Sequence, residues 1–384
     1  MDIEDLRRIV AEDAAIRQIQ RLQPIGGAGE KIMPAVYDGH RHAIEHRRID
    51  GEIVPCAVLA GVPRQARLLS AAMLKAIRKG VIRIAYISVD FSEFSDFVDH
   101  GEVTTLDAPH RLYDAIFRDS ETLDGTPFPR TELYQSLDAA SPRDSRALFA
   151  ASPTALLFGT WNSTGHRGGR GGKFARCLVS EIIAVGIAVD ANGKYDGVRS
   201  TGRMDPLQIR RGVPIVIDDD GDWRIGDGRR GQSTPAQINH GNIPPMLVGG
   251  GVSADHCRRI TALSCAALRR CRLPTHDELA AHVMLAALGL FALASQKDDD
   301  YLLRSRCHLV PDGNAPLEIV RRDGSILTVE LDAAEATRLA EEAIAAARQA
   351  GVPWGDMPLR LRPQEKLTEL VRRSREIDVS DEES

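Results

Sequence analysis

Apolar residues recur at helical spacing in several parts of the chain. Over residues 2–21 they fall close to one helix face, which predicts an amphipathic helix; they are Ile3, Leu6, Ile9, Val10, Ala14, Ile16 and Ile19. Two further predicted helices have marked ends, because Pro63 begins one that Gly80 stops and Gly351 stops an alanine-rich one at 333–350. Additional helices are predicted at 107–120, 143–150, 253–271 and 277–295.

Strands are predicted where apolar and β-branched residues alternate or form short runs. These segments are 53–60, 82–91 and 155–161. Turn residues predict two hairpins, one around Asp219-Asp220-Gly221 and one around Arg322-Asp323-Gly324 within 317–331. The first half of 173–189 fits a helix and the second half a strand, whereas 234–251 is a loop dense in Pro, Gly and Asn. Because strands and helices do not alternate regularly, we expect an α+β fold rather than a doubly wound parallel sheet.

Composition excludes some classes of protein. A hydrophobic share of 43% and a charged share of 27% are those of a globular chain, neither disordered nor fibrous. The apolar stretch 279–295 is shorter than the roughly 18–20 residues of a membrane span, and the acidic N-terminus is not that of a signal peptide. The six cysteines form no CxxC pair, so we expect reduced, mostly buried thiols in a cytoplasmic protein.

Charge is unevenly distributed along the chain. The formal net charge is −5, so an anionic partner must be met by a local patch. Residues 145–180 contain no acidic residue; they do contain Arg146, Arg167, Arg170, Lys173 and Arg176, with glycines at 165, 168, 169, 171 and 172. Glycines let a backbone approach a ligand, and arginine forks suit phosphate oxygens. This pattern predicts a loop that grips a polyanion backbone; the alternative is a flexible glycine loop with solvated arginines.

Mononucleotide binding by this loop is disfavoured. If Gly172 and Lys173 were the GK of a Walker A motif, the first glycine would fall on Arg167 and the magnesium-binding Ser or Thr on Phe174. The histidines at 40, 42 and 46 put two imidazoles on one helix face, yet they lack the glutamate of a zinc-protease motif and a further ligand. We therefore expect no metal and no cofactor.

Two other stretches carry polar groups that suit recognition. Residues 235–245 hold Asn239, His240 and Asn242, which would hydrogen-bond bases, sugars or a partner backbone; an ordered loop that satisfies its own backbone is the alternative. Arg199 and Arg203 would extend the basic surface, or they are simply solvated.

Three runs together resemble a known family. They are 157–165 (LFGTWNSTG), 173–183 (KFARCLVSEII) and 237–245 (QINHGNIPP), which occur in the family's order. They resemble the backbone subunit of type I-U (also called I-G) CRISPR Cascade complexes, a member of the Cas-seven group of RAMP proteins. The resemblance covers about residues 20–300. It implies an RRM-like (ferredoxin-like) palm within 1–300 with inserted helices and loops forming fingers and thumb. Residues 301–384 would complete the core and end in an acidic tail.

The resemblance also implies an antiviral role without catalysis. Copies of such subunits stack in a helical filament along one CRISPR RNA, grip its backbone, and leave its bases free to pair with target DNA. The implied partners are the CRISPR RNA, the other Cascade subunits, further copies of the chain, and target DNA through the guide, with no membrane. A metal-dependent RNase or nucleotide-binding enzyme that uses the glycine/arginine loop is the alternative.

The family motifs place the candidate RNA-binding residues. Arg167, Arg170, Lys173 and Arg176 match the basic, glycine-rich motif and are expected on guide phosphates. Their neighbours in the same motif are expected on sugar or base; they are Trp161, Asn162, Ser163 and His166. Asn239, His240 and Asn242 match the later motif and are expected to contact RNA or a neighbouring subunit.

Overall fold

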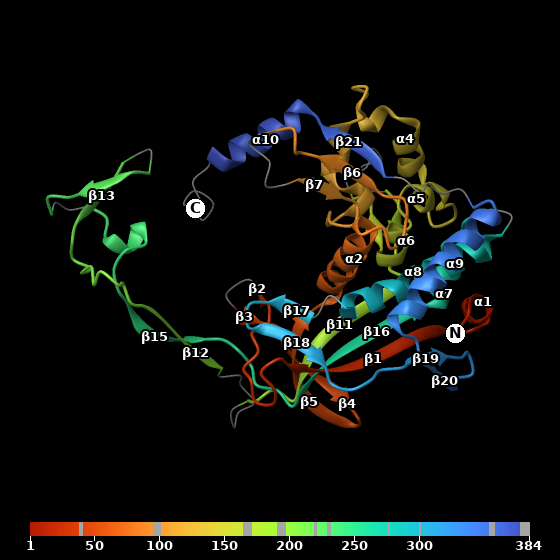
Figure 1. The fold of residues 1–384 in the computed structure, drawn as a ribbon, viewed down its shortest axis with the longest axis horizontal. Coiled ribbons are helices and arrows are strands. Elements are labelled where there is room, and N and C mark those ends of the chain that lie inside the picture. Colours follow the sequence, from red (N-terminus) through yellow and green to blue (C-terminus); the bar gives the residue numbers. More distant parts are fainter. Residues whose placement is uncertain are drawn as a thin grey trace.

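The computed structural model has the mixed α+β architecture that the sequence predicts (Figure 1). It describes residues 1–37, 41–94, 101–163, 171–189, 197–218, 221–228, 232–274, 277–298, 301–352 and 358–376. The predicted acidic tail at 380–384 lies outside these residues.

A curled antiparallel sheet forms the base of the molecule. Its central strand β1 (Ala15–Pro24) pairs with β16 (His256–Ser264) from Ala15 opposite Ser264 to Leu22 opposite Cys257. Beyond β16 the sheet continues through β11 (Leu178–Val185), β5 (Glu52–Ala60) and β4 (Ile44–Ile49). On the other side of β1 lie β18 (Cys307–Pro311), β17 (Tyr301–Arg304), β19 (Leu317–Val320) and β20 (Ile326–Val329).

The two central strands correct the sequence prediction. Helices were predicted over 2–21 and 253–271, but only α1 (Ile3–Glu12) and α7 (Cys265–Arg270) are helical there. Ile19, which fits the predicted helical stripe, is 40% exposed, whereas Gln20 is buried. In β16 the alternate residues Cys257, Arg259, Thr261 and Leu263 are buried. A period of two therefore governs both segments, because pairing across the sheet overrides local helix preference.

Helix α8 (Glu278–Asp298) is the centre of the main core. It packs against α1, α2 (Val62–Arg78), α6 (Thr154–Phe158), α7 and α9 (Ala333–Gln349). By length and composition it is apolar enough to span a membrane, but 78% of that apolar window is buried inside the protein, as in a core helix. The predicted helices α2, α8 and α9 are confirmed, and Gly80 and Gly351 follow α2 and α9 with φ of 74° and 68°.

A smaller sheet lies on the far side of α2 from the main sheet (Figure 1). Its strands, in order, are β7 (Glu102–Thr104), β6 (Ile87–Asp90), β21 (Leu359–Pro363) and β8 (Ser120–Glu121). Short helices surround it: η3 (Arg111–Tyr113), α3 (Ala115–Arg118), η4 (Phe128–Arg130), α4 (Glu132–Ala139), α5 (Arg146–Ala151) and α10 (Glu365–Glu376). The strand predicted at 82–91 is thus shorter, and the helix predicted at 107–120 is broken. The strand predicted at 155–161 is wrong for its first part, which forms the buried helix α6.

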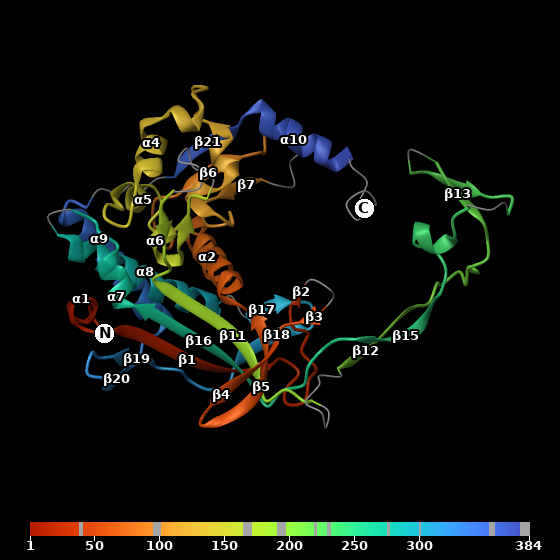
Figure 2. The ribbon, with the colours of Figure 1, turned by 180° about the vertical axis from the view of Figure 1, so that it is seen from behind.

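A long two-stranded arm leaves the main body (Figures 1 and 2). It consists of β12 (Val198–Arg203) and β15 (Ile243–Gly249), and its tip carries the predicted hairpin β13 (Ile215–Ile217) and β14 (Trp223–Ile225) with η5 (Pro235–Ile238). The loop predicted at 234–251 is therefore partly strand. The six cysteines are free and buried, which confirms the predicted burial of unpaired thiols.

The buried position of α8 predicts a large loss of stability on truncation. Leu288→Ala should lower the free energy of unfolding by about 2–5 kcal/mol, because Leu288 is fully buried and the change leaves a cavity. The same change at Leu302, which is 61% exposed, should stay within about 0.5 kcal/mol. Urea unfolding measures both, and similar losses would contradict this packing.

Candidate nucleic-acid interface

The glycine/arginine segment is carried by a short hairpin. Strand β9 (Thr160–Trp161) pairs antiparallel with β10 (Lys173–Phe174), so that Trp161 lies opposite Lys173. The connection between them includes residues 164–170, and the predicted site residues His166, Arg167 and Arg170 lie outside the described residues.

The hairpin presents a cation on an aromatic ring. Lys173 Nζ lies 5.3 Å from the centre of the Trp161 ring, within the range of a cation–π interaction. Both side chains are exposed, Trp161 to 46%. An exposed indole beside an ammonium group offers a stacking surface and a phosphate contact at one place.

The next residue along the hairpin has a structural role in this arrangement. Asn162 is buried, its Nδ2 donates to Oδ1 of Asp138 in α4 at 2.9 Å, and its backbone N–H donates to the carbonyl of Gly172 at 3.1 Å. A Cβ at Gly171 would come within 2.3 Å of the Asn162 carbonyl oxygen. At this position the glycine is required by packing of the hairpin against itself. Ser163 is partly buried beside it.

Arg176 lies where the hairpin meets the body. Gly159 has φ of 77°, and a Cβ there would come within 2.8 Å of Arg176 Cγ and 3.0 Å of the Phe174 carbonyl oxygen. Thr160 Oγ1 donates to the carbonyl of His110 at 3.0 Å, which holds β9 beside η3.

A cavity of about 280 Å³ opens at this junction. Four arginines from three segments of the chain line it, namely Arg64, Arg67, Arg111 and Arg176. Among the described residues, no ion pair neutralises any of the four. Asp107 also lines the cavity, but its Oδ2 accepts hydrogen bonds from the backbone N–H and Oγ1 of Thr104, at 3.1 and 2.7 Å.

Burial and mutual repulsion perturb two of these arginines. Arg111 is only 6% exposed, and burial followed by repulsion from Arg176 lowers its pKa to about 10, so it stays protonated at neutral pH. Its Nη1 donates to Ser70 Oγ at 3.0 Å, and its guanidinium lies 4.9 Å from the centre of the Phe158 ring. Burial and then repulsion from Arg67 lower the pKa of Arg64, whose Nη2 donates to the Leu303 carbonyl at 3.2 Å.

Sequence reasoning found Arg176 but missed the other three arginines. Arg64 and Arg67 follow Pro63 in the first two turns of α2, and the first turn contains no acidic residue. That arginine pair at a predicted helix start was a usable signal. Arg111 had none, because its burial and its left-handed φ of 52° depend on the fold.

The later motif lies on the arm, where hydrogen bonds join it to the end of β12 and the residues that follow. Arg203 Nε and Nη2 donate to the Gly241 carbonyl at 3.2 and 3.0 Å, and Asn242 Oδ1 accepts from the Asp205 backbone N–H at 2.6 Å. The His240 ring lies 6.1 Å from the Trp223 ring, and Asn239 is exposed in a left-handed conformation. Arg199 lies on β12.

The arm residues are not brought to the hairpin within one chain. In both views the tip of the arm, marked by β13, stands well away from α6 and the segment that follows it (Figures 1 and 2). The two family motifs therefore occupy different parts of the molecule.

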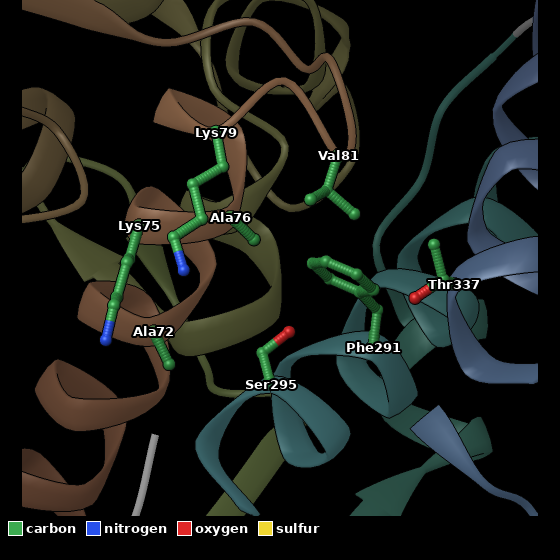
Figure 3. A pocket seen from close by; sticks show the side chains of 8 residues that line it. All are labelled: Ala72, Lys75, Ala76, Lys79, Val81, Phe291, Ser295 and Thr337. Atoms are coloured by element: carbon green, nitrogen blue, oxygen red, sulfur yellow. The ribbon is translucent and has the colours of Figure 1, made fainter. Parts of the chain in front are cut away.

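Among the described residues, the histidine motif is divided between two strands and forms no metal-binding group. His42 lies on β3 (Arg41–His42) and His46 on β4, so they do not share a helix face as predicted, and His40 is outside the described residues. Within the described part of the chain, no group of three His, Cys, Asp or Glu side chains is placed to hold a metal. A cavity of about 180 Å³ lies at the surface where α2, α8 and α9 meet, and its lining includes Lys75 and Lys79 of α2 and Phe291 and Ser295 of α8 (Figure 3).

The junction predicts an effect of adding a methyl group at Gly159. Gly159→Ala places a side chain in a left-handed conformation and against Arg176 and the Phe174 carbonyl. Gly29→Ala is the control, because Gly29 has φ of 83° but nothing near the added Cβ. We expect Gly159→Ala to destabilise by at least about 1 kcal/mol more than Gly29→Ala in urea unfolding, through overpacking. Equal losses would contradict the close contact.

Comparison with known proteins connects this region to CRISPR systems. Residues 16–189 match the family model described as CRISPR-associated protein GSU0053. One similar solved structure is the crystal structure of Thermofilum pendens Csc2, at 12% identity and a TM-score of 0.27, covering 91% of this chain and 81% of that one. No curated protein matches the sequence. The matched residues include the hairpin and the four cavity arginines. The match to the family model supports the CRISPR association that the sequence resemblance implied.

Proposed function

We propose that this chain is a non-catalytic backbone subunit of a CRISPR Cascade-type complex, which holds the CRISPR RNA by its phosphate backbone. The observation that carries the proposal is the basic surface running from Lys173 on Trp161 to Arg176, inside the segment that matches a CRISPR-associated family. In a chain of net charge −5, that surface is the local patch that an anionic partner requires.

The chemistry of the hairpin suits a grip that ignores sequence. An ammonium group and guanidinium groups bind phosphates whatever the base, and an indole stacks on any base. Bases that are not read by the protein stay available for pairing with target DNA. This division of labour supports a guide-holding role over a base-specific one.

The arm supports a role in assembly. Several large apolar side chains of the arm are mostly exposed to solvent, such as Met204, Leu207 and Leu247. Exposed apolar surface of this kind marks interaction sites. We infer that the arm reaches a neighbouring copy or another Cascade subunit, and that copies repeat through an open heterologous interface along one RNA. The sheet of β1, β16, β11 and β5 would serve as the RRM-like palm, in the cytoplasm.

Salt dependence tests the backbone grip. Lys173→Ala should weaken binding of two unrelated single-stranded RNAs by the same factor. It should also reduce the slope of log affinity against log salt by about 0.7, the value for one phosphate contact. Lys297→Ala removes an exposed lysine elsewhere and serves as the control. Fluorescence anisotropy over a potassium chloride series measures both. A loss confined to one RNA sequence would argue against the grip.

The absence of catalysis has a direct test. Labelled single-stranded RNA incubated with the protein over a magnesium and manganese series should remain intact on a denaturing gel. Metal-dependent cleavage that one carboxylate substitution abolishes would replace the proposal with the RNase alternative.

A further inference from the structure

The cavity at the start of α2 gathers positive charge from three separate parts of the chain. Arg64 and Arg67 come from the first two turns of α2, Arg111 from η3, and Arg176 from the segment between β10 and β11. Hydrogen bonds hold these parts together: Arg111 donates to Ser70 of α2, and Thr160 of β9 donates to His110. The fold itself therefore brings the four arginines together, and their proximity does not depend on flexible surface side chains alone.

Arg111 is a buried cation whose contacts are uncharged. A buried guanidinium normally has a carboxylate partner, because removing its charge from water is costly. Among the described residues, Arg111 contacts one neutral hydroxyl and one aromatic ring, and a second arginine lining the same cavity, Arg176, repels it. An anion in the cavity would offset both the burial and the repulsion that lower the pKa of Arg111.

The start of α2 adds a favourable dipole. This helix has 17 residues, its N-cap is Gly61 with no side-chain hydrogen bond, and its first turn holds no acidic residue. Backbone N–H groups at such a terminus, together with the helix dipole, favour an anion. Helix, buried arginine and rim arginines face the same cavity.

The size and lining of the cavity limit what can enter. Its volume of about 280 Å³ is slightly below the volume of typical ligand pockets, which begin at about 300 Å³. Phe158 is the aromatic residue in the lining, but it is 1% exposed and lies beneath the Arg111 guanidinium, so its ring offers no surface for stacking a base. The lining thus suits a phosphate group with part of its ribose better than a whole nucleotide.

We propose that this cavity binds one phosphate group, with Arg111 at its floor and Arg64, Arg67 and Arg176 around its rim. Resting on the proposed function, that phosphate is a phosphodiester of the guide RNA, which passes from the Trp161–Lys173 hairpin into the cavity past Arg176. A free phosphate is the other source of the same chemistry.

Arg67 is the residue to change first, because its side chain is exposed and makes no hydrogen bond or ion pair to the rest of the described residues. Arg67→Gln should weaken binding of single-stranded RNA several-fold, and Arg67→Glu by about tenfold, the loss expected for one charge-assisted contact. Arg78→Gln is the control: it removes the same charge from the other end of α2, where Arg78 pairs with Glu102. Arg111→Lys, checked for folding by circular dichroism, should weaken RNA binding while retaining a charge.

Inorganic phosphate distinguishes the two sources. At constant ionic strength, phosphate should raise the melting temperature of the wild-type protein and of Arg78→Gln relative to chloride, and should not raise that of Arg67→Glu. If phosphate binds but the Arg67 variants hold RNA normally, free phosphate is the ligand and the guide assignment is overturned. If neither phosphate binding nor RNA binding responds to Arg67 while Lys173→Ala still weakens RNA, the cavity proposal fails alone. A wild-type protein that binds no RNA at all would instead remove the proposed function.

Discussion

The pairing of β1 with β16 is the interaction on which the rest of the structure depends. The two strands lie more than two hundred residues apart in the chain and form an eight-residue antiparallel ladder at the centre of the sheet. β11, β5 and β4 extend the sheet from β16, while β17 to β20 extend it from β1. Gln296 of α8 accepts a hydrogen bond from Arg259 of β16, and α2 follows β5 in the chain and packs on β11. The site at the start of α2 therefore takes its position from the sheet that the central pair organises.

Two buried arginines show how the same group serves structure in one place and a site in another. Arg259 of β16 is fully buried, and its guanidinium donates to the amide oxygens of Gln18 and Gln296, which lock β1 and α8 to the strand. Arg111 is buried to a similar degree but borders an open cavity with Arg176 beside it. Two amide oxygens offset the charge of Arg259, whereas Arg111 donates to a single hydroxyl beside a cavity that three further arginines line.

Segments with strong local signals were predictable. Pro63 and Gly80 bound α2, Gly351 follows α9, and turn residues locate the hairpins of β13 with β14 and β19 with β20. Segments whose state depends on distant partners were not. β1 and β16 read as helices because their apolar spacing is ambiguous over short windows and their pairing partners are more than two hundred residues away. α6 read as a strand because a short, wholly buried apolar run carries no period.

By itself, the sequence determined the properties that neighbouring residues create: the acid-free segment 145–180 in an acidic chain, the helix ends, the turns, and the motifs that resemble a CRISPR subunit. Only the tertiary structure decided which charges act together. It buried Asn162 against Asp138, turned the later motif into bonds within the arm, and joined Arg176 to Arg64, Arg67 and Arg111. The reason is physical, because burial and electrostatic repulsion depend on distance in space. Residues 64 and 176 are far apart in the sequence and become neighbours only in the folded chain.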